Sequence, residues 1–125
     1  MKKPAERFDL SQTNARLHRD GTSDVVSCRG PHGSIDGYVI GAPSMTRSPP
    51  HGGELHPDGD ELLYLVSGDV HVILEEADGE RVIELVPGTA VIVPKNVWHR
   101  VLVRKPSQLV HITPGPGGEH RPLRR

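Results

Sequence analysis

The sequence predicts an all-β domain built as a sandwich or a barrel, and three observations support this prediction. From Asp24 onward, short runs rich in β-branched and aliphatic residues follow one another at close spacing. Gly and Pro, 14 and 12 of the 125 residues, stand between these runs as turn signals. None of the runs has the 3.6-residue period of an amphipathic helix. A chain of this length forms one domain with a modest core.

The strands follow in order from the apolar runs and from the turn residues between them. We expect strands near residues 24–29, 37–42, 53–56, 61–67, 70–75, 81–85, 90–93, 98–104 and 108–113. The separators are Gly30-Pro31, Pro49-Pro50, Asp58-Gly59, Gly68-Asp69, Asp78-Gly79, Pro87-Gly88 and Lys105-Pro106. Of these, Asp78-Gly79 is typical of a tight hairpin, because both residues tolerate positive φ.

The predicted barrel takes residues 23–114. Residues 1–22 are polar and of mixed charge, and we expect them to form an arm. Residues 115–125 are rich in Pro and Gly and basic, and we expect a loose tail.

The charge balance and the composition exclude several classes of protein. Fifteen basic and 16 acidic residues give no field that would gather nucleic acid or an anionic membrane. No apolar run is long enough to span a bilayer, and the first nine residues have no apolar centre of the kind a signal peptide needs. The single Cys28 cannot form an internal disulfide. We therefore expect a cytoplasmic protein with no nucleic-acid or membrane partner.

The segment HGGELHPDGDE, residues 51–61, holds two histidines and four carboxylates directly before an apolar run. Side chains alternate across a strand, so Glu54 and His56 share one face. Glu61 in turn shares the face of Leu63, which points to the interior. A carboxylate at the edge of an apolar interior is costly unless it is paired or binds a metal.

A third histidine follows some forty residues later. His99 alternates with Val101 and Val103, so it faces an apolar interior. Together, His56, Glu61 and His99 form a set of two imidazoles and one carboxylate. Such a set suits zinc with one open position, or iron, manganese or nickel with several.

The first of two motifs in this region resembles the cupin family pattern G-x5-H-x-H-x3-4-E-x6-G. Here His56, Glu61 and Gly68 stand in register with the second His, the Glu and the final Gly. Ser48 replaces the opening Gly, and Glu54 replaces the first His.

The second motif resembles the cupin pattern G-x5-P-x-G-x2-H-x3-N. Gly88, Pro94 and His99 match it, whereas Asn96 replaces the turn Gly and Val103 the closing Asn. Asn readily takes left-handed dihedral angles, so we expect the turn to persist.

This resemblance implies a double-stranded β-helix of the jelly-roll type that assembles as a homodimer. It also implies one divalent metal ion, Fe, Mn, Ni or Zn, bound by His56, Glu61 and His99 with Glu54 at the fourth place.

The role of Glu54 has two interpretations. As a ligand it completes a two-His-two-Glu site; as a free carboxylate beside the metal it is a general base. His51 is a further candidate ligand, but it is out of phase with Glu54, so a surface role is expected for it ahead of ligation. Asp58 and Asp60 lie in a turn and are expected to be solvated.

Two functions remain open at this point. One is a metal-dependent enzyme of the dioxygenase or isomerase type that acts on a small organic acid or a sugar-like compound. The other is a non-catalytic module that holds a small ligand or a metal, and a barrel with an empty polar patch is the plain structural alternative. Fold alone does not separate them.

Overall fold

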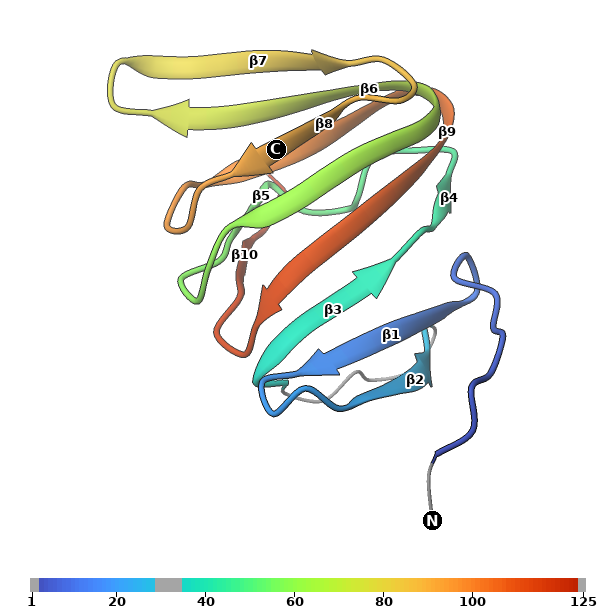
Figure 1. Cartoon of the computed structure of the whole chain (residues 1–125). Coiled ribbons are helices and arrows are strands. Elements are labelled where there is room, and N and C mark those ends of the chain that lie inside the picture. Colours follow the sequence, from blue (N-terminus) through green and yellow to red (C-terminus); the bar gives the residue numbers. More distant parts are fainter. Residues whose placement is uncertain (1–2, 29–34, 124–125) are drawn as a thin grey trace.

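The computed structural model describes residues 3–28 and 35–123, and within these ranges it contains ten strands and no helix (Figure 1). The strands are β1 Thr13–His18, β2 Ser23–Ser27, β3 Gly37–Gly41, β4 Ser44–Met45, β5 Gly53–Leu55, β6 Glu61–Glu76, β7 Gly79–Leu85, β8 Ala90–Val93, β9 His99–Gly115 and β10 Glu119–Arg121. Strands β10, β5, β9, β3, β1 and β2 lie side by side in that order, β4 pairs with β9, and β6 pairs with β7, β8 and β9. The predicted all-β fold is confirmed, whereas the turn predicted at Gly30-Pro31 lies outside the described residues.

The long strands β6 and β9 join the two halves of the barrel. The first half of β6 pairs with β8 and with the C-terminal half of β9. Its second half pairs with β7 and with the N-terminal half of β9. Figure 1 shows both strands bending at the same end of the molecule. A sheet folded over in this way encloses an interior between its two halves.

The bend in β6 lies at Gly68, where the sequence predicted a turn between two separate strands. Instead, shifts in the β6–β9 register mark a β-bulge within one continuous strand. Gly68 has a φ of 101°, and a Cβ there would lie 2.1 Å from Ser107 Oγ. The Asp69 N–H donates to Ser107 Oγ (3.0 Å), whose hydroxyl donates to the Lys105 carbonyl (2.7 Å). The turns predicted at Gly68-Asp69 and Lys105-Pro106 are therefore bends within β6 and β9, and the two bends face each other.

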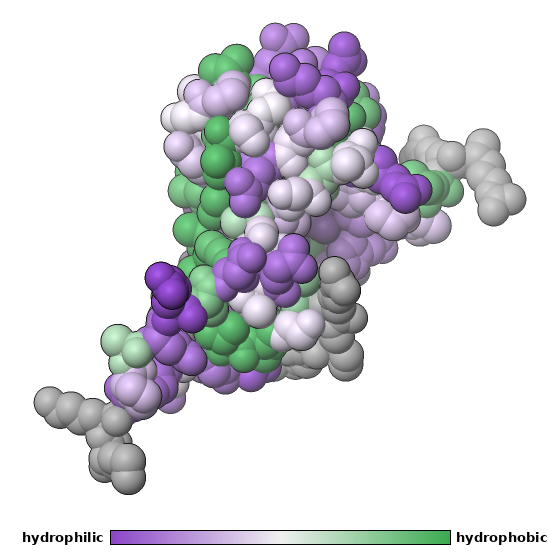
Figure 2. Space-filling view, turned by 90° about the vertical axis from the view of Figure 1, so that its right-hand side faces the viewer, coloured by the Kyte–Doolittle hydropathy of each residue, from purple (hydrophilic) through white to green (hydrophobic). Residues whose placement is uncertain are grey.

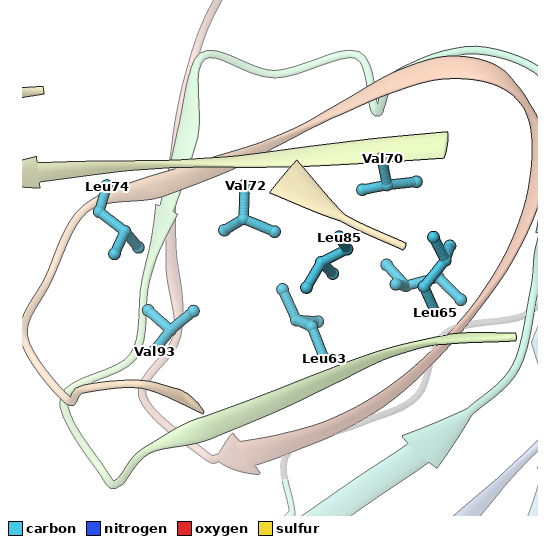
Figure 3. Close-up of a cluster of buried hydrophobic side chains, with 8 residues drawn as sticks. Leu63, Leu65, Val70, Val72, Leu74, Leu85 and Val93 are labelled. Carbon is cyan, nitrogen blue, oxygen red and sulfur yellow. The ribbon is translucent and has the colours of Figure 1, made fainter. Parts of the chain in front are cut away.

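Alternate residues of β6 form the core between the two halves (Figure 3). Leu63 and Leu65 from the first half point toward Val70, Val72 and Leu74 from the second half. None of these side chains is more than 3% exposed. Full burial of one such side chain stabilises the fold by about 1.5–3 kcal/mol. The first residue of β6 belongs to the same inward-facing series, so the core fixes its direction.

Strand β1 lies within residues 1–22, where the sequence predicted an arm. It pairs with β2 on one side and with β3 on the other. Polar contacts hold it, because Arg16 Nε and His18 Nε2 lie 2.6 Å and 3.1 Å from the Asp24 carboxylate. The hydrogen bonds with Arg16 and then His18 lower the pKa of Asp24 to about 2. A polar strand of this kind contains no apolar run, so the sequence pattern does not predict it.

Strand β10 lies within residues 115–125, where the sequence predicted a loose tail. It pairs with β5. The Arg121 guanidinium lies 4.1 Å from the centre of the Trp98 ring and forms an ion pair with Glu75. These contacts hold the end of the described chain against the barrel.

Apolar residues also lie on the outer face of the barrel. Cross-strand pairing places Ile40, Ile112, Leu62 and Ile92 in one row across β3, β9, β6 and β8. Their side chains point away from the interior, which the neighbouring Leu63 enters. Figure 2 shows apolar surface along one side of the face it presents. The described ranges hold no helix long and apolar enough to cross a bilayer.

Candidate metal centre

Four side chains that the sequence singles out meet inside the barrel. Glu54 lies on β5 and His56 directly follows that strand, while Glu61 begins β6 and His99 begins β9. Glu54 and His99 are cross-strand partners in the β5–β9 pairing. Each of the four residues offers one ligand atom, and these atoms all lie within 4.8 Å of one another. We call these four residues the inner site.

The loop between β5 and β6 is held in place by the loop before β9. The Asn96 N–H donates to the His56 carbonyl (3.0 Å), and the Lys95 N–H donates to Asp60 Oδ1 (2.9 Å). Asn96 has a φ of 63°, the left-handed conformation that the sequence predicted for it. Asp58 and Asp60 are exposed, as predicted, and both accept backbone hydrogen bonds.

The distances in the inner site are close to those expected around one metal ion, and of the four only the one between Glu54 and His99 is longer. His99 Nε2 lies 2.9 Å from Glu61 Oε1, and His56 Nε2 lies 3.5 Å from Glu61 Oε2. Glu54 Oε2 lies 3.3 Å from His56 Nε2 and 3.8 Å from His99 Nε2. Ligands bound at about 2.0–2.2 Å from one ion are separated from each other by about 2.8–3.6 Å. The inner site therefore fits a divalent ion with little rearrangement.

The carboxylates and the imidazoles of the inner site set each other's protonation. Burial opposes the charged form of His56, but hydrogen bonds with Glu54 and Glu61 outweigh it and raise the pKa of His56 to about 9. Burial likewise opposes the charge of Glu61, yet its bonds with His56 and His99 hold the pKa of Glu61 well below its usual range. By the same balance the pKa of His99 is raised and that of Glu54 is lowered. A cation between these groups would take the place of the protons.

Neighbouring groups orient two of the four ligands. His99 Nδ1 donates to the Val97 carbonyl (3.0 Å), which leaves Nε2 to face the inner site. Thr113 Oγ1 donates to Glu61 Oε2 (2.6 Å). His111 Nδ1 lies 2.8 Å from the same hydroxyl, whose single proton points at the carboxylate, so the imidazole is the donor there. Such contacts fix the direction of a ligand before the ion binds.

Sequence reasoning did not include Thr113 and His111 in the site. A signal was present, because both residues alternate with Leu109, which is 4% exposed. Because Leu109 points inward, strand alternation predicts that His111 and Thr113 also lie on the inner face.

Two further histidines lie on the other side of Glu54. His51 Nε2 is 3.1 Å and His120 Nε2 is 3.3 Å from Glu54 Oε1. The sequence assigned His51 to the surface because it is out of phase with Glu54, yet its side chain is only 18% exposed. His51 lies in the bend before β5, where the strand alternation on which that assignment depended does not apply.

A cavity of about 400 Å³ opens beside the inner site. Glu54, His56 and Glu61 reach into it. Other polar side chains in its lining are Asn14, His111, Thr113 and His120. Its apolar lining includes Ile35, Val39, Met45, Leu63, Val101 and Leu109. The inner site is thus the most highly charged part of a small, largely apolar chamber.

Two positions at which the sequence departs from the motif pattern contact each other. The Val103 N–H donates to Ser48 Oγ (2.9 Å). The serine in place of the motif's opening Gly therefore supports the strand that carries the valine in place of its closing Asn.

Comparisons with known proteins show the family and the fold of the chain. The family model described as a Cupin domain matches residues 43–115. A cupin-2 domain-containing protein from Shewanella frigidimarina NCIMB 400 has a TM-score of 0.53 and 19% identity, over 62% of this chain and 71% of that chain. A protein from Neisseria meningitidis has a TM-score of 0.50 and 26% identity, over 69% and 78%. Oxalate decarboxylase from Bacillus subtilis, an enzyme with Mn(II) centres, has a TM-score of 0.54 and 17% identity, over 66% and 23%.

No curated protein matches the chain. The matched residues 43–115 contain all four residues of the inner site and run from the loop before β4 to the end of β9. With its antiparallel strands folded into a double-stranded β-helix of the jelly-roll type, the chain belongs to the cupin family.

Proposed function

We propose that this cupin binds one divalent metal ion, Fe, Mn, Ni or Zn, at the inner site and acts on a small oxygen-bearing molecule beside it. The observation that carries the proposal is the convergence of four ligand atoms within 4.8 Å of one another at the wall of a cavity. The ligands would be His56, Glu61 and His99 with Glu54, which is near enough to His56 and His99 to share an ion with them. The Mn(II) centres of oxalate decarboxylase, a member of the same fold, are in keeping with this proposal.

The chemistry would be of the dioxygenase or isomerase type. A bound ion of this kind supplies Lewis acidity toward a carbonyl or an enolate, or a place for dioxygen. The protein's own residues hold the ligands in position through Thr113 and the Val97 carbonyl. Apolar groups such as Val101 and Leu109 keep bulk water away from the reacting molecule.

The size and lining of the cavity favour a small ligand. About 400 Å³ is near the lower end of the range for small-molecule pockets. Polar groups in the lining, among them Asn14 and His111, could orient a carboxylate or hydroxyl group. A small organic acid or a sugar-like compound fits both conditions.

A second candidate is a binding module without catalysis. Glu54 Oε2 lies among the donor atoms of the inner site, so a four-coordinate ion would have only protein ligands. Such an ion would have no open position for a substrate. A six-coordinate ion would keep two open positions, which is what an enzyme requires.

Metal analysis of the protein purified without an affinity tag or added metal tests the proposal. We expect close to one ion per chain at the inner site in the wild type, lost in His99→Ala. His71→Ala removes a histidine outside the inner site and should keep the ion. Retention of the ion in Glu54→Ala would favour the general-base role for Glu54, and its loss would favour ligation. A wild-type protein that cannot be loaded with any of the four metals would rule the proposal out.

We also propose that the chain forms a homodimer through the outer apolar row of Ile40, Ile112, Leu62 and Ile92. The row crosses four paired strands and contains no charged side chain. Ile92 is 53% exposed, which is unfavourable for an isoleucine left in water. A second copy of the same face would cover it by pairing like surfaces about a twofold axis.

A further inference from the structure

The two oxygens of Glu54 face two different groups of imidazoles. Oε2 lies 3.3 Å from His56 Nε2 and 3.8 Å from His99 Nε2, both in the inner site. Oε1 lies 3.1 Å from His51 Nε2 and 3.3 Å from His120 Nε2. His51, Glu54 and His120 offer ligand atoms within 4.8 Å of one another, and we call them the outer site.

Backbone pairing builds the outer site. His120 on β10 is the cross-strand partner of Glu54 on β5, which is in turn the partner of His99 on β9. Directly paired residues of antiparallel strands present their side chains on the same face. His120, Glu54 and His99 therefore form one row across three strands, and His51 reaches Oε1 from the loop before β5.

The strand that carries His120 is held firmly for one so close to the end of the described chain. Arg121 stacks on Trp98 and pairs with Glu75, and its carbonyl accepts the Gly52 N–H (2.7 Å). These contacts fix both β10 and the loop that carries His51, because Gly52 directly follows that residue. The three donors are thus brought together by packing that does not depend on a metal ion.

We propose that the outer site binds a second divalent cation, held by His51 Nε2, His120 Nε2 and Glu54 Oε1. Two imidazoles and one carboxylate oxygen form a donor set that suits zinc and similar ions. The rings of His51 and His120 lie with centroids 5.0 Å apart at 55°, so both Nε2 atoms can face one ion without stacking. The His120 side chain is 63% exposed, so water completes the coordination.

Binding at the outer site has one identifiable cost. His51 Nδ1 accepts a 3.2 Å hydrogen bond from the Gly53 N–H. A metal on Nε2 places the ring proton on Nδ1, which removes that acceptor. One long hydrogen bond between neutral groups contributes far less than a metal–imidazole bond supplies.

The outer cation rests on its own three donors, whereas its connection to the inner ion rests on the proposed function. If both ions bind, the carboxylate of Glu54 bridges them with one oxygen on each. A Glu54 carboxylate with a cation on each oxygen would be too weak a base to act as a general base. The second cation therefore bears directly on the role of Glu54.

Zinc titration of the chelator-treated full chain, followed by equilibrium dialysis and elemental analysis, tests the outer site. We expect two Zn²⁺ per chain in the wild type and one in both His120→Gln and His51→Gln, with the remaining affinity little changed. His71→Gln, a half-buried histidine outside both sites, should keep two. Because His120 is exposed, its variant should fold, and an unchanged circular dichroism spectrum would show this. Glu54→Gln should lower the metal affinity of both sites by at least about 10-fold.

The outcomes separate the two proposals. One ion in the wild type, lost in His99→Gln but kept in His120→Gln, would overturn the outer site and leave the inner site intact. One ion lost in His120→Gln but kept in His99→Gln would support the outer site and count against the proposed function. With Mn²⁺ as the probe, a bridged pair should show magnetic coupling in its electron paramagnetic resonance spectrum. Two uncoupled Mn²⁺ signals would overturn the bridge.

Discussion

The hydroxyl of Thr113 donates a 2.6 Å hydrogen bond to Glu61 Oε2, and through this bond β9 sets the direction of a ligand on β6. His111 supports the hydroxyl from behind. Glu61 is 3% exposed, so solvent is a poor replacement for a lost partner. The pair explains how a carboxylate at the start of β6 stays directed at the inner site, because the strand paired beside it holds it there.

Replacing Thr113 by Val keeps the shape of the side chain but removes the donor. We expect metal affinity at the inner site to fall by about 10–100-fold, the usual effect of losing a group that orients a ligand. Thr89→Val is the matched control, because the Thr89 hydroxyl bonds the exposed turn at Val86, away from the inner site. Competition with a metal indicator would measure both variants. Equal affinities in the two variants would show that Thr113 does not orient Glu61.

Metal affinity should rise steeply with pH. In the metal-free protein the pKa of His56 is raised to about 9, so its imidazole carries a proton at neutral pH. An ion binds only the neutral ring, so binding releases that proton. Calorimetry at pH 7 in two buffers of different ionisation enthalpy should detect the release. A metal affinity that does not change between pH 6.5 and 9.5 would contradict this prediction.

The same shift sets the sign of a stability change in the metal-free protein. The folded pKa of His56 lies above the usual value of 6.5, so its charge stabilises the fold fully below about 6.5. That contribution is lost as the pH rises through about 9. Urea unfolding of metal-free protein should therefore give a lower midpoint at pH 9.5 than at pH 6.5. The His56→Gln variant should lose most of this difference.

The bulge at Gly68 predicts that this glycine tolerates substitution poorly. An added Cβ would lie 2.1 Å from Ser107 Oγ, and the residue also has a φ of 101°. Gly88 has a φ of 88° but open space around it, so Gly88→Ala carries the backbone strain without the clash. We expect Gly68→Ala to lower the free energy of unfolding by more than the roughly 1–3 kcal/mol of strain alone. An equal loss of unfolding free energy in the two variants would show that Ser107 can move away from the added Cβ without destabilising the fold.

The direction of the inner-site residues could be predicted where strand alternation is unbroken. Glu61 begins a series in which Leu63 and Leu65 face inward, and His99 likewise lies among inward-facing residues. Alternation alone therefore placed both ligands. It failed at His51, because that residue lies in a bend before β5 begins and so outside the strand to which alternation applies.

The elements that the sequence did not predict are held by contacts with other elements, most of them far along the chain. Strand β1 depends on pairing with β3 and on the contact of Arg16 with Asp24. Strand β10 depends on Arg121 reaching Trp98. The bend at Gly68 likewise becomes a bulge only because β9 runs alongside it without a break. Each of these depends on the tertiary fold, which local composition does not encode.

The outer apolar row predicts how the oligomeric state can be changed. Ile92→Glu places a charge in the row, where a second copy would have to bury it at a cost of several kcal/mol. Sedimentation velocity should show the wild type at twice the mass of the 13.6 kDa chain and the variant at the mass of one chain. Val82→Glu is the control, because Val82 is 52% exposed on β7 and lies outside the row. A monomeric wild type would contradict the proposed dimer. A dimer that persists in Ile92→Glu would show that its interface lies elsewhere. Loss of the dimer in Ile92→Glu alone would assign the interface to this face of the barrel, opposite the cavity, and leave the inner site open in each copy.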